Sequence, residues 1–125
     1  MLLYYLYYST ILMSGYALIE STYRYYNQKK YTTLGQTIIT FVWSPFIINH
    51  FYYFNNYDIE NYGILLFPFN IWLCEITSGY ISLYFFNIRF WNYNDNLTFF
   101  NKMISLYFYP HWLSLGIIIN YLFIF

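Results

Sequence analysis

Long apolar stretches alternate along the chain with short clusters of charged and turn-forming residues. A helix that crosses a bilayer needs about 20 mostly apolar residues, because the hydrocarbon core is roughly 30 Å thick. The strict polar–apolar alternation of membrane-spanning strands is absent from these stretches. The pattern therefore predicts an all-α fold, a four-helix transmembrane bundle that forms one integral membrane domain over residues 1–125. The predicted spans cover approximately residues 2–25, 33–54, 62–86 and 103–125.

Prolines fall within three of the predicted spans. Pro68 lies in the first turns of the third span, where a missing backbone N–H is tolerated. Pro45 and Pro110 are expected further inside the second and fourth spans. Each is expected to kink its helix, and neighbouring helices would then have to satisfy the freed carbonyl group.

Composition supports a lipid bilayer as the surrounding medium. The residues are 60% hydrophobic and 30% aromatic, and only 8% are charged, against about 25% in soluble domains. Five Lys and Arg balance five Asp and Glu, so no positive field attracts phosphate backbones and no nucleic-acid partner is expected. The single cysteine, Cys74, has no partner for a disulfide or a CxxC motif. We therefore expect a multi-pass membrane protein.

Charge differs between the three predicted connections. The first and third are basic and the second is acidic. The residues are Arg24, Lys29 and Lys30, then Asp58 and Glu60, then Arg89 and Lys102. With four spans the two basic connections share one side, so the positive-inside rule predicts that they are cytoplasmic and that both termini are outside.

Glu75 is the strongest functional candidate, because an ionisable side chain inside a span is costly and marks a site by default. No basic residue lies within one helical turn of it. Glu75, Ser78, Gly79 and Ser82 follow helical spacing and share one face, as small and polar residues do where membrane helices pack closely. Two interpretations remain: a packing seam with one buried glutamate, or a substrate or proton site.

Glu20 is the second carboxylate inside a predicted span. Arg24 follows it by four residues, so the two can pair on one helix face and lower the cost of burial. A structural pair is favoured over a transport role. In the second span, Thr33, Thr37, Thr40 and Ser44 share a face and predict a second wall of the same seam.

His50 and His111 each lack the HxxxH or ExxH spacing of a metal site on one helix, so no metal is expected. His111 lies between Pro110 and Trp112, where it would approach Glu75 if their helices were antiparallel neighbours.

Motifs for catalysis are absent from the sequence. It contains no GxxxxGK[ST], no GxSxG and no HExxH. We therefore expect neither enzymatic activity nor a cofactor.

A set of positions in the second half resembles a known family. These positions are Trp72, Glu75, Thr77, Gly79 and Tyr80, then Phe86, Asn87, Arg89, Trp91, Asn92 and Tyr93, then Phe100, Lys102, Ile104, Leu106, Pro110 and Trp112. Their order and spacing are similar to the transmembrane protein 229 family and to related bacterial integral membrane proteins classed as ABC-transporter type IV. The resemblance implies a small multi-pass protein without a well-defined activity.

The sequence departs from that family at Asn92 and Asn94, where relatives usually have Trp-Asp-Tyr-Ser in place of Trp91-Asn92-Tyr93-Asn94. A role that needs a negative charge there is therefore not expected. Some relatives have basic residues in the second connection, which implies cytoplasmic termini and conflicts with the orientation inferred from charge.

Two functions remain on this basis. The first is a non-catalytic membrane protein that acts through assembly, as a subunit or modulator, with a second copy of itself or another membrane subunit as partner. The alternative is a transporter or permease component with Glu75 as its protonatable group and with Arg89, Trp91 and Tyr93 gating one mouth. An enzyme acting on lipid is a third, less favoured class.

Overall fold

The computed structural model describes residues 2–28, 34–93 and 96–122, and in them the chain is predominantly helical. The elements are α1 (Leu2–Gln28), α2 (Leu34–Asn56), α3 (Glu60–Phe86), β1 (Thr98–Phe99), β2 (Ile104–Ser105), the 3₁₀-helix η1 (Leu106–Phe108) and α4 (Tyr109–Leu122). The predicted all-α class is confirmed.

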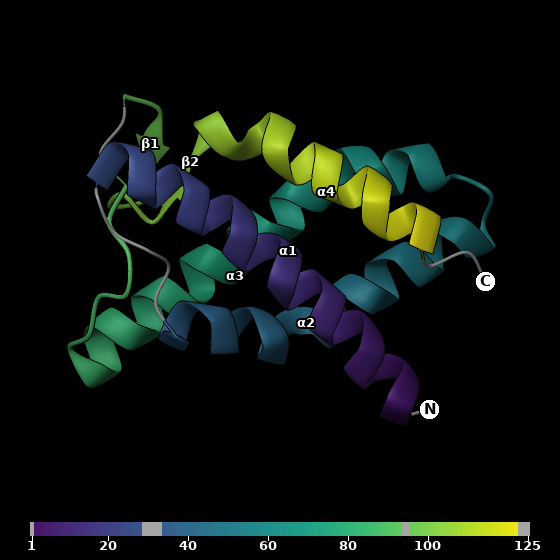
Figure 1. Cartoon of the computed structure of the whole chain (residues 1–125), viewed down its shortest axis with the longest axis horizontal. Helices are drawn as coiled ribbons and strands as arrows, with labels where there is room; N and C mark the ends of the chain where they lie inside the picture. Colours follow the sequence, from purple (N-terminus) through teal and green to yellow (C-terminus); the bar gives the residue numbers. More distant parts are fainter. Residues whose placement is uncertain (1, 29–33, 94–95, 123–125) are drawn as a thin grey trace.

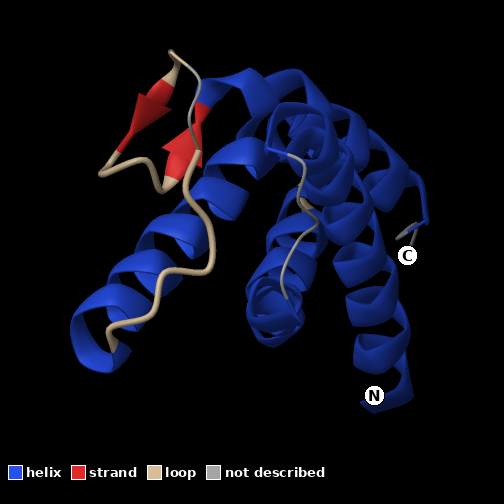
Figure 2. Ribbon diagram, turned by 60° about the vertical axis from the view of Figure 1, so that its left-hand side comes forward, coloured by secondary structure: helices blue, strands red, loops and turns tan. Residues whose placement is uncertain are grey.

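Each helix packs against the next along the chain. α1 packs on α2, α2 on α3 and α3 on α4, whereas the contact between α1 and α4 is smaller. Figure 1 shows both termini and the connection from α2 to α3 at one end of the bundle, and the last turns of α1 with the short hairpin at the other. In Figure 2 the segment that follows α3 runs back alongside the helices to reach the hairpin.

The first three predicted spans match α1, α2 and α3 to within a few residues. α3 already begins at Glu60, so Pro68 is the ninth residue of the helix. The prediction that Pro68 lies in the first turns of this helix is therefore wrong. The helix continues through it without the hydrogen bond that its missing N–H would make. α3 ends at Asn87, whose φ of 54° is left-handed, a conformation that asparagine adopts at helix ends more readily than most residues.

The predicted fourth span, 103–125, is wrong at its start. Residues 104 and 105 form β2, paired antiparallel with β1 in the register Thr98↔Ser105. The Ser105 side chain then accepts a hydrogen bond from the Tyr107 N–H and caps η1. Pro110 is the second residue of α4, where no N–H is needed, so the predicted kink inside the span is also wrong.

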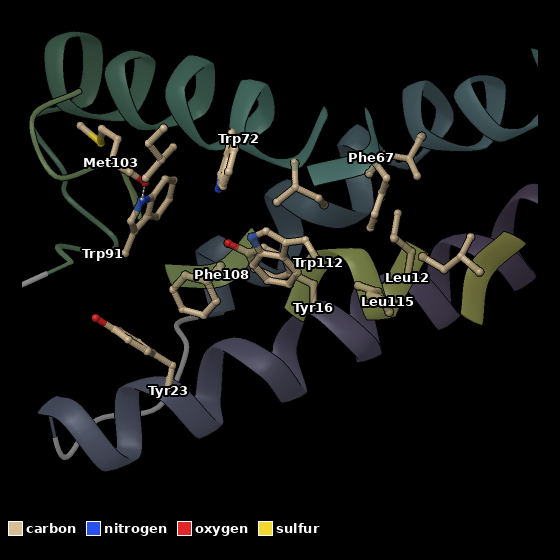
Figure 3. Packing of buried hydrophobic residues seen from close by; sticks show 14 of the residues in the cluster. Leu12, Tyr16, Tyr23, Phe67, Trp72, Trp91, Met103, Phe108, Trp112 and Leu115 are labelled. Carbon is tan, nitrogen blue, oxygen red and sulfur yellow. Dashed lines mark hydrogen bonds between the residues drawn. The ribbon is translucent and has the colours of Figure 1, made fainter. Parts of the chain in front are cut away.

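Aromatic side chains connect the first helix of the chain, α1, with the last, α4. The Tyr16 ring of α1 stacks on Trp112 of α4 with 5.1 Å between ring centroids, and Trp112 stacks on Phe108 at 5.3 Å. Figure 3 shows these rings between α1 and α4. Tyr16 and Trp112 are both buried, and they belong to the hydrophobic cluster that extends through all four helices.

Large apolar side chains are exposed along every helix. Examples from the middle of α1, α2 and α3 are Leu18, Val42 and Leu73. Where the structure describes side chains on α1 to α4, the exposed ones include none that is charged. One segment of the described chain, Asn61–Phe86, is by length and composition suited to cross a membrane.

We predict that Gly116→Leu destabilises the fold by about 2 kcal/mol, the usual scale for overpacking a tight contact. A Cβ at Gly116 would lie 2.9 Å from Cδ2 of Phe67, a fully buried ring on α3. Denaturant unfolding in detergent, followed by circular dichroism, measures the change. Ser114→Leu adds similar bulk on the exposed face of α4 and should have little effect. Equal stability of both variants would contradict the prediction.

Candidate functional site

Tyr93 links two buried glutamates from different helices. Its hydroxyl group lies within hydrogen-bond distance of Glu20 Oε1 on α1 and 2.6 Å from Glu75 Oε2 on α3. Glu20 is 0% exposed, Glu75 2% and Tyr93 1%. Three segments that are distant in sequence therefore meet at one hydroxyl group inside the bundle.

Helical periodicity places the two glutamates toward the interior. Along α1 the buried positions include Leu12, Tyr16, Glu20 and Tyr23, a spacing of four, four and three that forms one face of a helix. Glu75 lies on the corresponding buried face of α3. The sequence thus commits each carboxyl group to an apolar face, where it needs a hydrogen-bond partner.

The segment after α3 is held so that Tyr93 points into the bundle. The Trp91 Nε1–H donates to the Met103 carbonyl at 2.7 Å, drawn as a dashed line in Figure 3. The Tyr93 N–H donates to the Lys102 carbonyl at 3.2 Å. Gly79 of α3 makes room, because a Cβ there would lie 3.3 Å from both Trp91 Cζ2 and Met103 Cγ.

Arg89 fixes the outer part of the same segment. Its guanidinium group donates to the carbonyl groups of Trp91 and Asn101 and to Asn92 Oδ1. The turn at 100–102 is left-handed at three consecutive residues, with φ of 55°, 57° and 62°. Non-glycine residues rarely adopt this conformation, so the hydrogen bonds around Arg89 stabilise a turn that local preferences disfavour.

Arg24 supplies the positive charge beside the glutamates. It is 5% exposed, and its Nη1 donates to Gln36 Oε1 at 3.2 Å and to the Phe90 carbonyl at 3.3 Å. The Gln36 amide donates in turn to the Tyr16 hydroxyl at 2.7 Å. Arg24 also interacts electrostatically with Glu20. The predicted partners Glu20 and Arg24 therefore belong to a larger network that includes α2.

The second oxygen of each carboxyl group, Glu20 Oε2 and Glu75 Oε1, is buried without a hydrogen-bond partner among the described residues. Burial raises the pKa of the Tyr93 hydroxyl well above its usual range, so Tyr93 keeps its proton at neutral pH. The arrangement can hold and exchange protons between carboxyl groups.

Seam residues predicted from small and polar side chains satisfy their hydroxyl groups within their own helices. Ser78 donates to the Cys74 carbonyl at 2.5 Å, Thr40 to Gln36 at 3.1 Å and Ser44 to Thr40 at 2.9 Å. Thr40, Ser44 and Gly79 are buried. These bonds remove the need for partners on other helices, so the seam contributes close packing. Thr33, Lys29, Lys30 and Asn94 lie outside the described residues.

The structure does not place His111 beside Glu75. It is exposed and stacks on Tyr107 with 5.2 Å between centroids. Two adjoining hollows of about 390 and 330 Å³ lie between α1 and α4 and share His111 with Leu18 and Ile19. The expected approach of His111 to Glu75 is wrong, because α4 turns Trp112 inward and His111 outward. Lys102 and Asn92 are also exposed.

Sequence reasoning missed Gln36. It precedes Thr40 and Ser44 by four and eight residues, so it shares their helix face, and that spacing could have identified it. No group of three or more His, Cys, Asp or Glu suited to a metal occurs among residues 2–28, 34–93 and 96–122.

Comparison of the chain with family models, with curated proteins and with solved structures found no match.

We predict that Tyr93→Phe lowers the free energy of unfolding by about 2 kcal/mol, because it leaves buried carboxyl groups without their hydrogen bond. Tyr121→Phe removes a hydroxyl from a side chain that is 74% exposed and should leave stability unchanged. Denaturant titrations of both variants in the same detergent provide the measurement. If Tyr93→Phe were as stable as Tyr121→Phe, the bridging hydroxyl would have no energetic role.

Proposed function

We propose that the chain is a multi-pass membrane protein, and the observation that carries this is that the exposed side chains described on α1 to α4 include none that is charged. Leu18, Val42 and Phe46 are 71%, 68% and 60% exposed. Their helices, α1 and α2, have 27 and 23 residues and are about 40 and 34 Å long at 1.5 Å per residue. Such surfaces suit lipid better than water. The tyrosines that lower their hydropathy suit the headgroup region.

The distribution of charge supports this proposal. Asp58 is exposed at the α2–α3 connection, and Lys102 is exposed in the turn of the hairpin near the opposite end of the bundle. Glu20, Arg24 and Glu75 are buried together. These five charged residues thus lie at the two ends or inside, as expected for a bundle in lipid. The positive-inside rule would place the hairpin end in the cytoplasm.

α4 has 14 residues and is about 21 Å long. η1 leads directly into it and adds about 6 Å. In this proposal η1 and α4 together form the fourth crossing.

Within the membrane the chain is proposed to act through assembly and not by catalysis. Its interior polar groups bind one another, and its hollows between α1 and α4 are lined mainly by apolar side chains. The proposed relationship to the transmembrane protein 229 family agrees with this role. Trp91, Tyr93 and Glu75, which carry the resemblance, lie in one cluster with the buried face of α3.

Purification from membranes in mild detergent, followed by native mass determination, tests this function. We expect the chain to resist extraction by alkaline carbonate and to run as a complex, either with copies of itself or with another membrane subunit. A monomer released by carbonate would contradict both parts of the proposal.

A second function, transport of protons across the membrane, is favoured by the contact of carboxyl groups from two helices with the same Tyr93 hydroxyl group. For this function we predict that proteoliposomes collapse an imposed pH gradient faster than empty liposomes, measured with an enclosed pH-sensitive dye. Glu75→Gln should reduce the rate to that of empty liposomes, because it removes the group that exchanges protons. Asp58→Asn, which changes an exposed carboxyl group, is the control. A rate unchanged by Glu75→Gln would exclude this function.

A further inference from the structure

The hydrogen atoms around Tyr93 can be counted. Its oxygen lies within hydrogen-bond distance of Glu20 Oε1 and of Glu75 Oε2. A hydroxyl group has one hydrogen atom and an ionised carboxylate has none to donate. Tyr93 can donate to one glutamate, and a bond to the other forms only if that glutamate donates its own proton to the Tyr93 oxygen. Both contacts are therefore hydrogen bonds only when one of the two carboxyl groups is protonated.

The buried charges lead to the same count. Arg24 is the basic residue of the cluster, and Glu20 and Glu75 are its acidic residues. With both glutamates ionised the cluster would have a net charge of −1, with two carboxylates sharing one hydroxyl. With one protonated, its net charge is zero. Burial strongly favours the neutral cluster, because an uncompensated charge in a low-dielectric interior is costly.

We propose that Glu20, Tyr93 and Glu75 form a proton-binding site inside the bundle, in which the two carboxyl groups share one proton through the tyrosine oxygen. The site holds residues 87–93 against the helices, and loss of the shared proton releases these residues. This proposal stands on the geometry of the cluster and holds for either function given above.

Release follows from the same hydrogen-bond count. When the shared proton leaves, two like charges lie on either side of the Tyr93 oxygen, and Tyr93 can donate to only one of them. Glu20 keeps its hydrogen bonds with Gln36 and Tyr16. When Tyr93 moves away, water can take its place and hydrate both carboxylates, and the backbone of residues 87–93 moves with the ring. The Tyr93 N–H bond to Lys102 and the Arg24 bond to the Phe90 carbonyl are the next contacts to break.

Other titratable and charged groups around the site are few in the described chain. α1 contributes Tyr16, Arg24 and Tyr23, whose ring contacts that of Tyr93, and α3 contributes Cys74, which neighbours Glu75. α2 contributes the uncharged Gln36. From α4, Trp112 stacks on Tyr16, and His111 is on the exposed side. The bridging geometry makes Glu20 and Glu75 the pair that shares the proton.

Infrared spectroscopy of the full chain in lipid nanodiscs tests the shared proton. At neutral pH we expect the C=O stretch of one protonated carboxyl group, shifted in D₂O. Glu20→Gln and Glu75→Gln should each remove this band, because the glutamine amide donates to Tyr93 while Tyr93 donates to the remaining carboxylate. Asp58→Asn should retain it. Absence of the band from the wild-type protein, or its persistence in both glutamine variants, would overturn the proposal.

Hydrogen exchange of the Tyr93 and Met103 amides tests release of the segment. Wild type and Glu75→Gln are compared at the same pH, so that intrinsic exchange rates cancel. We expect equal rates at neutral pH and about tenfold faster exchange in the wild type at alkaline pH, the scale expected from losing a hydrogen bond to a charged group. A ratio that stays at one over the whole pH range would show that the proton does not hold the segment.

Discussion

Burying two carboxyl groups and a guanidinium group inside an apolar bundle is the constraint from which the rest of the structure follows. Each of these groups needs hydrogen bonds that its own helix does not supply. The Tyr93 hydroxyl group bridges the two glutamates, and the Phe90 carbonyl and Gln36 accept hydrogen bonds from Arg24. The segment between α3 and the hairpin therefore has to enter the bundle. The hairpin turn at 100–102, with three left-handed residues, presents the Lys102 carbonyl to which the Tyr93 N–H donates.

Different kinds of side chain lie on the exterior and in the interior of the bundle. Apolar side chains cover most of the exposed helix faces that the structure describes, whereas Glu20, Arg24 and Glu75 are buried. This inverts the usual arrangement of a soluble domain. The proposed membrane environment and the proposed proton site are linked, since the exclusion of water that suits the outer surface also makes an unbalanced charge inside unfavourable.

Composition and local pattern were sufficient for three helices, because charged and asparagine-rich segments mark their ends. They failed for residues 103–108, where apolar side chains favour a helix or a buried strand equally well. Glu20 and Glu75 could be singled out because a carboxyl group in an apolar stretch is conspicuous. Their meeting through Tyr93 could not be predicted, because periodicity describes one helix face and carries no information on which distant face opposes it.

The residues that meet around Tyr93 and Arg24 lie far apart in the sequence, and this affects how the chain folds during synthesis. Glu20 is separated by 73 residues from Tyr93, and Arg24 by 66 from Phe90. When α1 and α2 leave the ribosome, Gln36 is available to Arg24, but the bridge to Glu20 has not been made. In the N-terminal pair of helices, Glu20 can interact with Arg24, Gln36 and Tyr16 but lacks its contact with Tyr93, and such a delayed long-range contact slows folding. A chain arrested at this stage would be a natural substrate for quality control.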